Sequence, residues 1–169
     1  MRTLIEQAKG YKVVLVASNN PHAAALDYAQ DAGLPTWTRD SKGMPREQFD
    51  AALGHELGDY QVGTIALAGY MRLLSNRFVD EWRGRIVNIH PSLLPKYPGL
   101  DTHARVLAAG DGVTGCSVHI VTEEVDAGEV IAQTQVPIEP GDDAASVEQR
   151  VLEAEHKLYP QALRDFVGR

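Results

Sequence analysis

Three short apolar runs rich in β-branched residues alternate with helical patterns, and this alternation limits the folds that the chain can adopt. The runs cover residues 11–18, 62–69 and 84–90. Such continuous runs are typical of strands that are buried on both faces of a parallel sheet. Helical patterns lie between them, over residues 21–33 and 45–60. This order predicts an α/β fold with a Rossmann-like open, mostly parallel sheet, right-handed crossovers and helices on both faces.

The second half of the chain has a different pattern. Residues 112–138 alternate apolar and polar side chains around the turn-like "DAG" at 126–128, which predicts an antiparallel hairpin added to the sheet. A long helix is predicted from Ser146 onwards, with a kink or break at Pro160. The predicted buried stripes are Phe49, Leu53 and Leu57 in the helix over 45–60, and Val147, Val151, Leu158 and Ala162 in the last helix.

Composition predicts a single domain over residues 1–169 that acts on small molecules. The net charge of −7 and the sequence pI near 5.3 disfavour nucleic acid or an anionic membrane surface as a partner, because both reward clustered Lys and Arg. Cys116 is the single cysteine, which excludes an internal disulfide and favours a reducing, cytoplasmic location. We expect a monomer or homodimer.

The segment "NIHPSLLPKYPGL", residues 88–100, holds three prolines and a glycine and therefore predicts a stiff loop. It places Asn88 and His90 at the end of the third strand run. In an open α/β sheet, ligands bind outside the carboxyl ends of the strands. Taken alone, an Asn and a His at a strand end are more often structural than catalytic, and Asp126 before Ala-Gly is usually a turn former.

Several longer segments together resemble the phosphoribosylglycinamide formyltransferases. They are "LAGYMRLLS", "NIHPSLLPKYPGLDTHARVLAAGD", "GCSVHIVTEEVDAGEVIAQ" and "EAEHKLYP". The resemblance implies a formyltransferase fold and transfer of the formyl group of 10-formyltetrahydrofolate to the amine of 5'-phosphoribosylglycinamide in de novo purine biosynthesis. It implies no metal and no tightly bound cofactor, since the formyl folate is a cosubstrate.

By this resemblance, Asn88, His90 and Asp126 are the catalytic trio. The residue types suit formyl transfer, which passes through a tetrahedral intermediate with an oxyanion. The amide of Asn88 can donate to the oxyanion, a contribution of about 2.7 to 4 kcal/mol for such donors. His90 can donate or transfer a proton, and Asp126 can favour the charged form of His90 or hold a water that shuttles protons.

The resemblance also assigns binding roles. For Arg46, a solvated surface arginine is an equally good interpretation, and the segment 71–74 is otherwise an ordinary loop that enters a helix. Glu155 is predicted to bind phosphoribosylglycinamide; it lies on the buried stripe of the last helix, where a carboxylate needs a partner, and a salt bridge to an Arg or Lys is the alternative. The predicted folate contacts are Arg46, Met71, Arg72, Leu73, Leu74, Asn88, Thr122, Glu123, Glu124, Val125 and Asp126.

The chain departs from the family pattern at its beginning. Family members open with a strand and a Gly- and Ser-rich turn that binds the substrate phosphate, whereas "MRTLIEQA" resembles the helix that follows. A start assigned too far downstream, a shortened chain and a diverged relative are all open explanations. We expect a gap in the sheet, lower stability and weaker binding of the phosphorylated substrate, while the folate half of the site could survive.

Three other functions stay open at this point. A metal hydrolase could use His90, His103 and His119 as ligands, although their spacing lacks a strong zinc signature. A truncated relative could bind folate with weak catalysis. A formyltransferase could use a different amine acceptor, because the trio reports the donor chemistry only.

Overall fold

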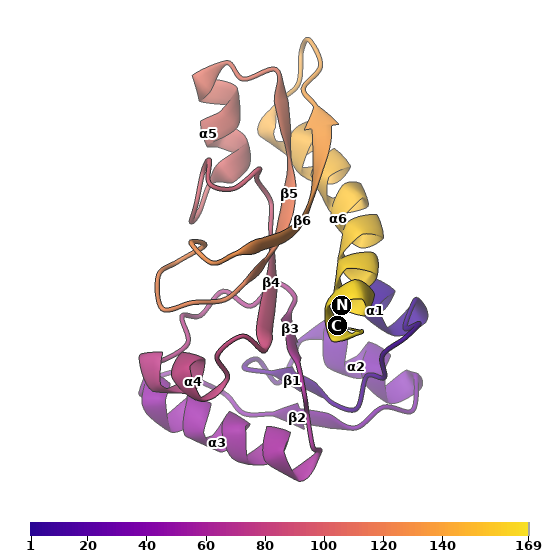
Figure 1. The fold of residues 1–169 in the computed structure, drawn as a ribbon, viewed down its shortest axis with the longest axis vertical. Helices are drawn as coiled ribbons and strands as arrows, with labels where there is room; N and C mark the ends of the chain where they lie inside the picture. The colour runs from indigo at the N-terminus through magenta and orange to yellow at the C-terminus, as the bar shows by residue number, and fades with distance from the viewer. Residues whose placement is uncertain (169) are drawn as a thin grey trace.

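The computed structural model describes residues 1–168, whose helices and strands alternate as the sequence predicts (Figure 1). Within this part of the chain, no helix is both long and apolar enough to cross a membrane. The elements in chain order are α1 (Arg2–Glu6), β1 (Val16–Ser18), α2 (Ala24–Asp31), β2 (Thr36–Thr38), α3 (Arg46–Asp59), β3 (Ile65–Leu67), α4 (Asn76–Glu81), β4 (Ile86–His90), α5 (Thr102–Ala109), β5 (Val113–Ile120), β6 (Val130–Pro137) and α6 (Ala144–Val167).

The strands form two sheets. A small sheet pairs β1 with β2 in parallel, and a larger sheet has the order β3-β4-β5-β6. In the larger sheet, β3 and β4 are parallel, while β5 and β6 form the antiparallel hairpin predicted around residues 126–128. The predicted α/β class, with parallel strands followed by an antiparallel part, is therefore confirmed.

A gap separates β1 from β3. Val16 N–H donates to Pro35 O on the side of β2, and Ile65 N–H donates to Arg85 O on the side of β4. The other edges of both strands line a cavity of about 560 Å³, whose walls include Leu53 and Leu57 of α3. The structure thus has the gap that we expected within the sheet.

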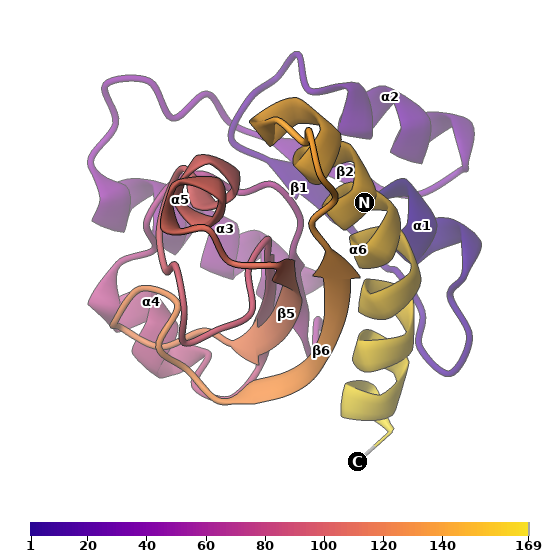
Figure 2. The ribbon, with the colours of Figure 1, turned by 90° about the horizontal axis from the view of Figure 1, so that it is seen from above.

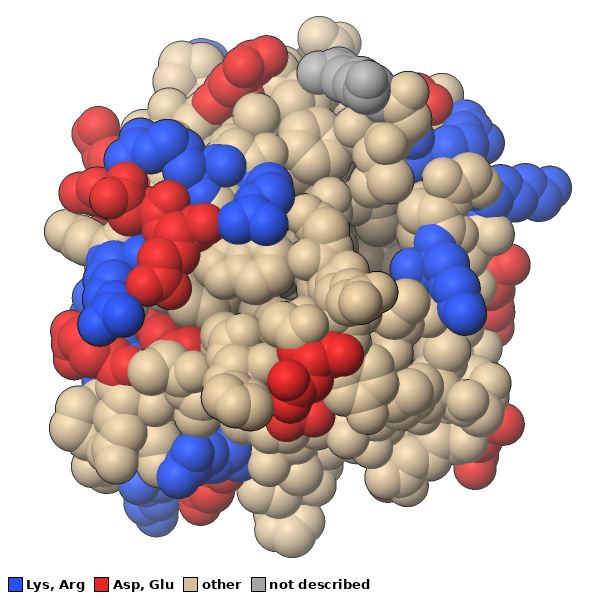
Figure 3. Space-filling model, turned by 60° about the horizontal axis from the view of Figure 1, so that its bottom comes forward, with Lys and Arg blue, Asp and Glu red and all other residues tan. Residues whose placement is uncertain are grey.

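On the end of the molecule shown in Figure 3, Lys and Arg lie among Asp and Glu rather than in one basic patch.

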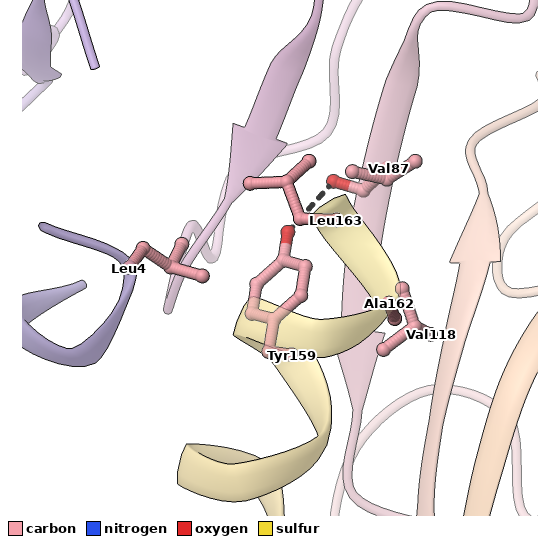
Figure 4. Packing of buried hydrophobic residues seen from close by; sticks show 6 residues of the cluster. All are labelled: Leu4, Val87, Val118, Tyr159, Ala162 and Leu163. Carbon is pink, nitrogen blue, oxygen red and sulfur yellow. Dashed lines mark hydrogen bonds between the residues drawn. The ribbon is translucent and has the colours of Figure 1, made fainter. Parts of the chain in front are cut away.

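Two helices close the core on either side of the larger sheet. Phe49, Leu53 and Leu57 are buried along α3, as predicted. On the other side, Tyr159 of α6 packs against residues of α1, β4 and β5 (Figure 4). Its hydroxyl donates to Leu67 O at 2.8 Å and to Val87 O at 3.1 Å, which ties α6 to both β3 and β4.

The last helix and the first strand differ most clearly from the predictions. The α6 helix runs without a break from Ala144 to Val167 through Pro160 (Figure 2). Of the predicted kink or break, the break was wrong, because buried neighbours such as Ala162 and Leu163 hold the helix against the sheet after the proline. The kink stays a prediction. In the run over residues 11–18, only β1 is a strand, because β2 offers it just three paired residues and the gap lies at its other edge.

Candidate active site

Four polar side chains meet where β4 ends. Asn88 and His90 lie two residues apart on β4 and therefore point to the same face of the strand. The antiparallel register places His119 of β5 opposite Asn88. Asp126 enters from the turn that joins β5 to β6. The structure therefore brings the three predicted catalytic residues together, and it adds His119 to them.

Asp126 is held by contacts with both of its carboxylate oxygens. Its Oδ2 accepts from Gly99 N–H at 2.8 Å and lies 3.2 Å from His90 Nδ1, while its Oδ1 lies 3.4 Å from His119 Nε2. Burial acts to raise the pKa of Asp126, but the hydrogen bonds from His119 and Gly99 and the nearby His90 outweigh it and lower the pKa below its usual value. The carboxyl is thus ionised at neutral pH.

His90 is buried with both ring nitrogens engaged. Its Nε2 lies 2.9 Å from Tyr97 O, and because a carbonyl oxygen only accepts, Nε2 is the donor. Its Nδ1 faces Asp126. A charged imidazole can donate at both positions, so this arrangement suits the imidazolium form. The ring is held between the loop and the hairpin turn.

The proline-rich loop is anchored to the hairpin by Ser117 of β5 and Gln133 of β6. Leu94 N–H donates to Ser117 Oγ at 3.0 Å, and Ser117 Oγ donates to Ser92 O at 2.6 Å. Gln133 Nε2 donates to Ser117 Oγ at 2.8 Å and to Leu94 O at 2.9 Å. These bonds fix the loop that supplies the Tyr97 carbonyl and the Gly99 amide. Neither Ser117 nor Gln133 was predicted as an anchor, although each is a polar residue within a strand of the hairpin.

The segment after β3 presents backbone and exposed apolar side chains. Arg72 turns away and donates to Ser41 O and Met44 O at 2.9 and 2.7 Å. Met71 is 78% exposed and Leu73 is 53% exposed, whereas Leu74 packs against the core of α3. An exposed apolar surface of this kind can cover a flat aromatic ligand. The predicted folate contacts through residues 71–74 stay a prediction.

Residues 122–125 lead directly to Asp126 and are exposed. Thr122 Oγ1 donates to Glu124 O at 3.1 Å, which begins the turn. A Cβ atom on Gly128 would lie 1.8 Å from Ile120 O, so the turn can close only with glycine at this position. The turn therefore holds Asp126 at a fixed distance from β5.

Arg46 is half-buried at the start of α3. It lies close to Tyr70, whose pKa is raised to about 12 by burial and by Asp50, with Arg72 and Arg46 acting in the opposite direction. The structure thus places both arginines at the same end of α3. The predicted contact of Arg46 with a folate remains untested.

Glu155 lies apart from the trio, on α6 between the chain start and β5. Burial raises its pKa to about 7, and the amino group of Met1 acts in the opposite direction. Burial, and to a smaller extent the charge of Glu155, raise the pKa of the Cys116 thiol to about 12. The amino group of Met1 is thus a charged neighbour of Glu155, and the roles predicted for Glu155 stay predictions.

The histidines named for a metal site do not form one. In residues 1–168, no group of three or more His, Cys, Asp or Glu side chains has the arrangement of metal ligands. His103 has a buried Nδ1 without a hydrogen-bond partner, and burial lowers its pKa. The metal-hydrolase alternative thus has no ligand cluster in the described part of the chain.

Comparisons with known proteins identify relatives of the chain. The Formyl transferase family profile matches residues 1–163. The phosphoribosylglycinamide formyltransferase of Escherichia coli is 42% identical over 98% of the chain and 81% of its own length. The crystal structure of the enzyme of the same name from Brucella melitensis superposes with a TM-score of 0.92 and 45% identity, over 99% of this chain and 88% of that one.

Longer relatives contain the same region as one part. The trifunctional purine biosynthetic protein adenosine-3 of Drosophila melanogaster is 51% identical over 92% of the chain, which spans only 12% of that protein. The match to single-function enzymes over most of their length, together with the family profile, settles the assignment. The chain belongs to the formyl transferase family.

Proposed function

We propose that the chain transfers the formyl group of 10-formyltetrahydrofolate to the amine of 5'-phosphoribosylglycinamide, giving formylglycinamide ribonucleotide and tetrahydrofolate in de novo purine biosynthesis. The observation that carries this proposal is the contact of His90 with the ionised Asp126 beside Asn88 at the end of β4. The relatives that match the chain over most of their length bear the name of this activity.

In the proposed reaction, each member of the trio has a chemical role. The amine of the acceptor attacks the formyl carbon, the resulting oxyanion accepts a hydrogen bond from the Asn88 amide, and the positive charge of His90 stabilises it electrostatically. The bond to N10 of the folate then breaks. The proton lost by the attacking amine goes to N10, with His90 or a water held by Asp126 as carrier. Ionised Asp126 favours the charged form of His90 in both steps.

The binding residues are proposed from the surfaces around this centre. Residues 71–74 and 122–126 flank the end of β4 and form the folate walls, with Arg46 near the glutamate tail. Glu155 binds the glycinamide ribonucleotide, and its half-buried carboxyl faces the chain start. We propose no metal and no tightly bound cofactor, a cytoplasmic location, and a monomer or homodimer that does not bind nucleic acid or membranes.

Two narrower alternatives concern which amine accepts the formyl group and how efficient the catalysis is. A weakly catalytic folate-binding relative and a formyltransferase with another amine acceptor share the same trio. The names of the matching enzymes favour phosphoribosylglycinamide. The described residues supply few candidate groups for binding the substrate phosphate, because the cavity between β1 and β3 lies where such groups were expected.

The test is a steady-state assay of formyl transfer from 10-formyltetrahydrofolate to glycinamide ribonucleotide. We expect turnover by the chain as written, and a decrease of about 10² to 10⁴-fold in His90→Ala. His22→Ala, on the exposed segment before α2, is the matched control and should retain full activity. Turnover that survives in His90→Ala, or its absence from the folded wild-type chain, would reject the proposal.

A further inference from the structure

His119 is a buried titratable residue that the proposed reaction leaves without a role. It lies on β5 between the apolar Val118 and Ile120, and only 2% of its surface is exposed. A buried polar side chain is unfavourable unless hydrogen bonds satisfy it. His119 has three such neighbours, and two of them, Asn88 and Asp126, are members of the proposed trio.

The imidazole ring of His119 has one orientation that satisfies these neighbours. Its Nδ1 lies 3.1 Å from Ile120 O, and because a carbonyl oxygen only accepts, Nδ1 carries a proton. This bond turns Nε2 toward the site. Nε2 lies 3.2 Å from Asn88 Nδ2 and 3.4 Å from Asp126 Oδ1. A single atom thus contacts both the amide and the carboxylate.

The two contacts through Nε2 make different demands on it. With a lone pair, Nε2 accepts from the Asn88 amide; with a proton, it donates to Asp126. In either state the ring fills the space between the two side chains and limits how each can rotate. The amide of Asn88 can otherwise turn about its χ2 angle, which is broad for this residue type.

We propose that His119 is a positioning residue, which uses Nε2 to hold the Asn88 amide and the Asp126 carboxylate in their reactive orientation. This role rests on the proposed formyl transfer. His119 acts through its two neighbours and does not touch the substrate. Its loss affects the chemical step more than substrate binding, because a displacement of about 1 Å among reacting groups can cost about 10²-fold in rate.

The experiment compares His119→Gln with His119→Asn. A Gln amide reaches the place of Nε2 and offers both an acceptor for Asn88 and a donor for Asp126. An Asn amide reaches only the place of Nδ1, so it keeps the bond to Ile120 O and loses both contacts. We expect His119→Gln to retain kcat within about threefold, and His119→Asn to lose about 10²-fold in kcat with the KM for the formyl folate unchanged.

The outcomes separate positioning from a structural role. Equal kcat losses in the two variants, or losses that follow the decrease in melting temperature, would overturn the proposal, as would full activity in both. His55→Asn, on the exposed face of α3, controls for removal of a histidine and should match the wild type.

A second measurement does not depend on turnover. The side-chain NH₂ signals of Asn88, assigned by their loss in Asn88→Ala, report its hydrogen bonding in ¹⁵N-labelled protein. We expect slow exchange in the wild type and in His119→Gln, and fast exchange in His119→Asn. If the wild type does not transfer formyl groups, the proposed function fails while these signals still decide the role of His119; unchanged signals in His119→Asn would overturn it.

Discussion

Asp126 and Glu155 are both partly buried carboxylates, but their surroundings shift their pKa values in opposite directions. At the end of β4, Asp126 receives hydrogen bonds from His119 and Gly99, which overcome the effect of burial and lower its pKa. On α6, burial dominates and raises the pKa of Glu155 to about 7. The first carboxylate is built to be charged, whereas the second is poised to gain or lose a proton near neutral pH.

The strands near the two carboxylates differ in whether both of their edges are paired. Asp126 lies beside β4 and β5, which pair with neighbours on both edges. Glu155 lies toward the chain start, beyond which β1 and β3 border the cavity without a strand between them. The geometry of the proposed catalytic trio therefore depends on the larger sheet and the proline-rich loop, and only weakly on the region around the chain start.

Replacing Asp126 by Asn has the largest expected effect. Asn tolerates the positive φ of 53° at this position, so the turn is preserved while the charge that favours the imidazolium of His90 is lost. We expect formyl transfer to decrease by about 10² to 10⁴-fold. Circular dichroism should show an unchanged fold, and activity within threefold of the wild type would contradict the role of the charge.

The second-largest expected effect is a dependence of the free energy of unfolding on pH, caused by Glu155. Because its folded pKa of about 7 lies above the unfolded value near 4.5, the folded state binds more protons between these values, and stability falls as the pH rises through this window. The loss amounts to up to about 3 kcal/mol. Urea unfolding at pH 5 and pH 8 should show it.

Glu155→Gln should remove most of this pH dependence and be more stable than the wild type at pH 8. Glu153→Gln, at an exposed position on the same helix, is the matched control and should keep the wild-type dependence. Equal pH profiles for the two variants would show that Glu155 is not the group responsible.

The anchoring of the loop gives a smaller effect on stability. Ser117→Ala leaves the amide of Leu94 without its acceptor and removes a partner of Gln133, at a cost of about 1 to 3 kcal/mol. Hydrogen exchange should show faster exchange of the Leu94 amide, while the amides of β1 stay unchanged. Gln135→Ala, exposed on β6, is the control. If Leu94 keeps its protection, the loop is held by other contacts.

The sequence predicted the elements whose signal is local. The stripe of Phe49, Leu53 and Leu57 is buried as expected, and the hairpin turns at Asp126. Strand register is not local, since it depends on which residues of two distant segments pair. For this reason His119, which the register places opposite Asn88, entered the sequence analysis only as a possible metal ligand.

The sequence pattern also could not predict that α6 continues through Pro160. A proline removes one hydrogen bond of the helix, and the pattern alone could not show that buried neighbours on α6 compensate for it. The catalytic trio was predicted through the resemblance of whole segments, because each of its residues alone has a more common structural interpretation.

A ¹³C label in the formyl group tests the proposed transfer reaction directly. The chain is mixed with 10-formyltetrahydrofolate carrying ¹³C in the formyl group and with glycinamide ribonucleotide, and the ¹³C signal is recorded over time. We expect the label to move to formylglycinamide ribonucleotide, and to stay on the folate when Asp126→Asn replaces the wild type. Label that remains on the folate with folded wild-type protein, or that appears as free formate, would contradict it.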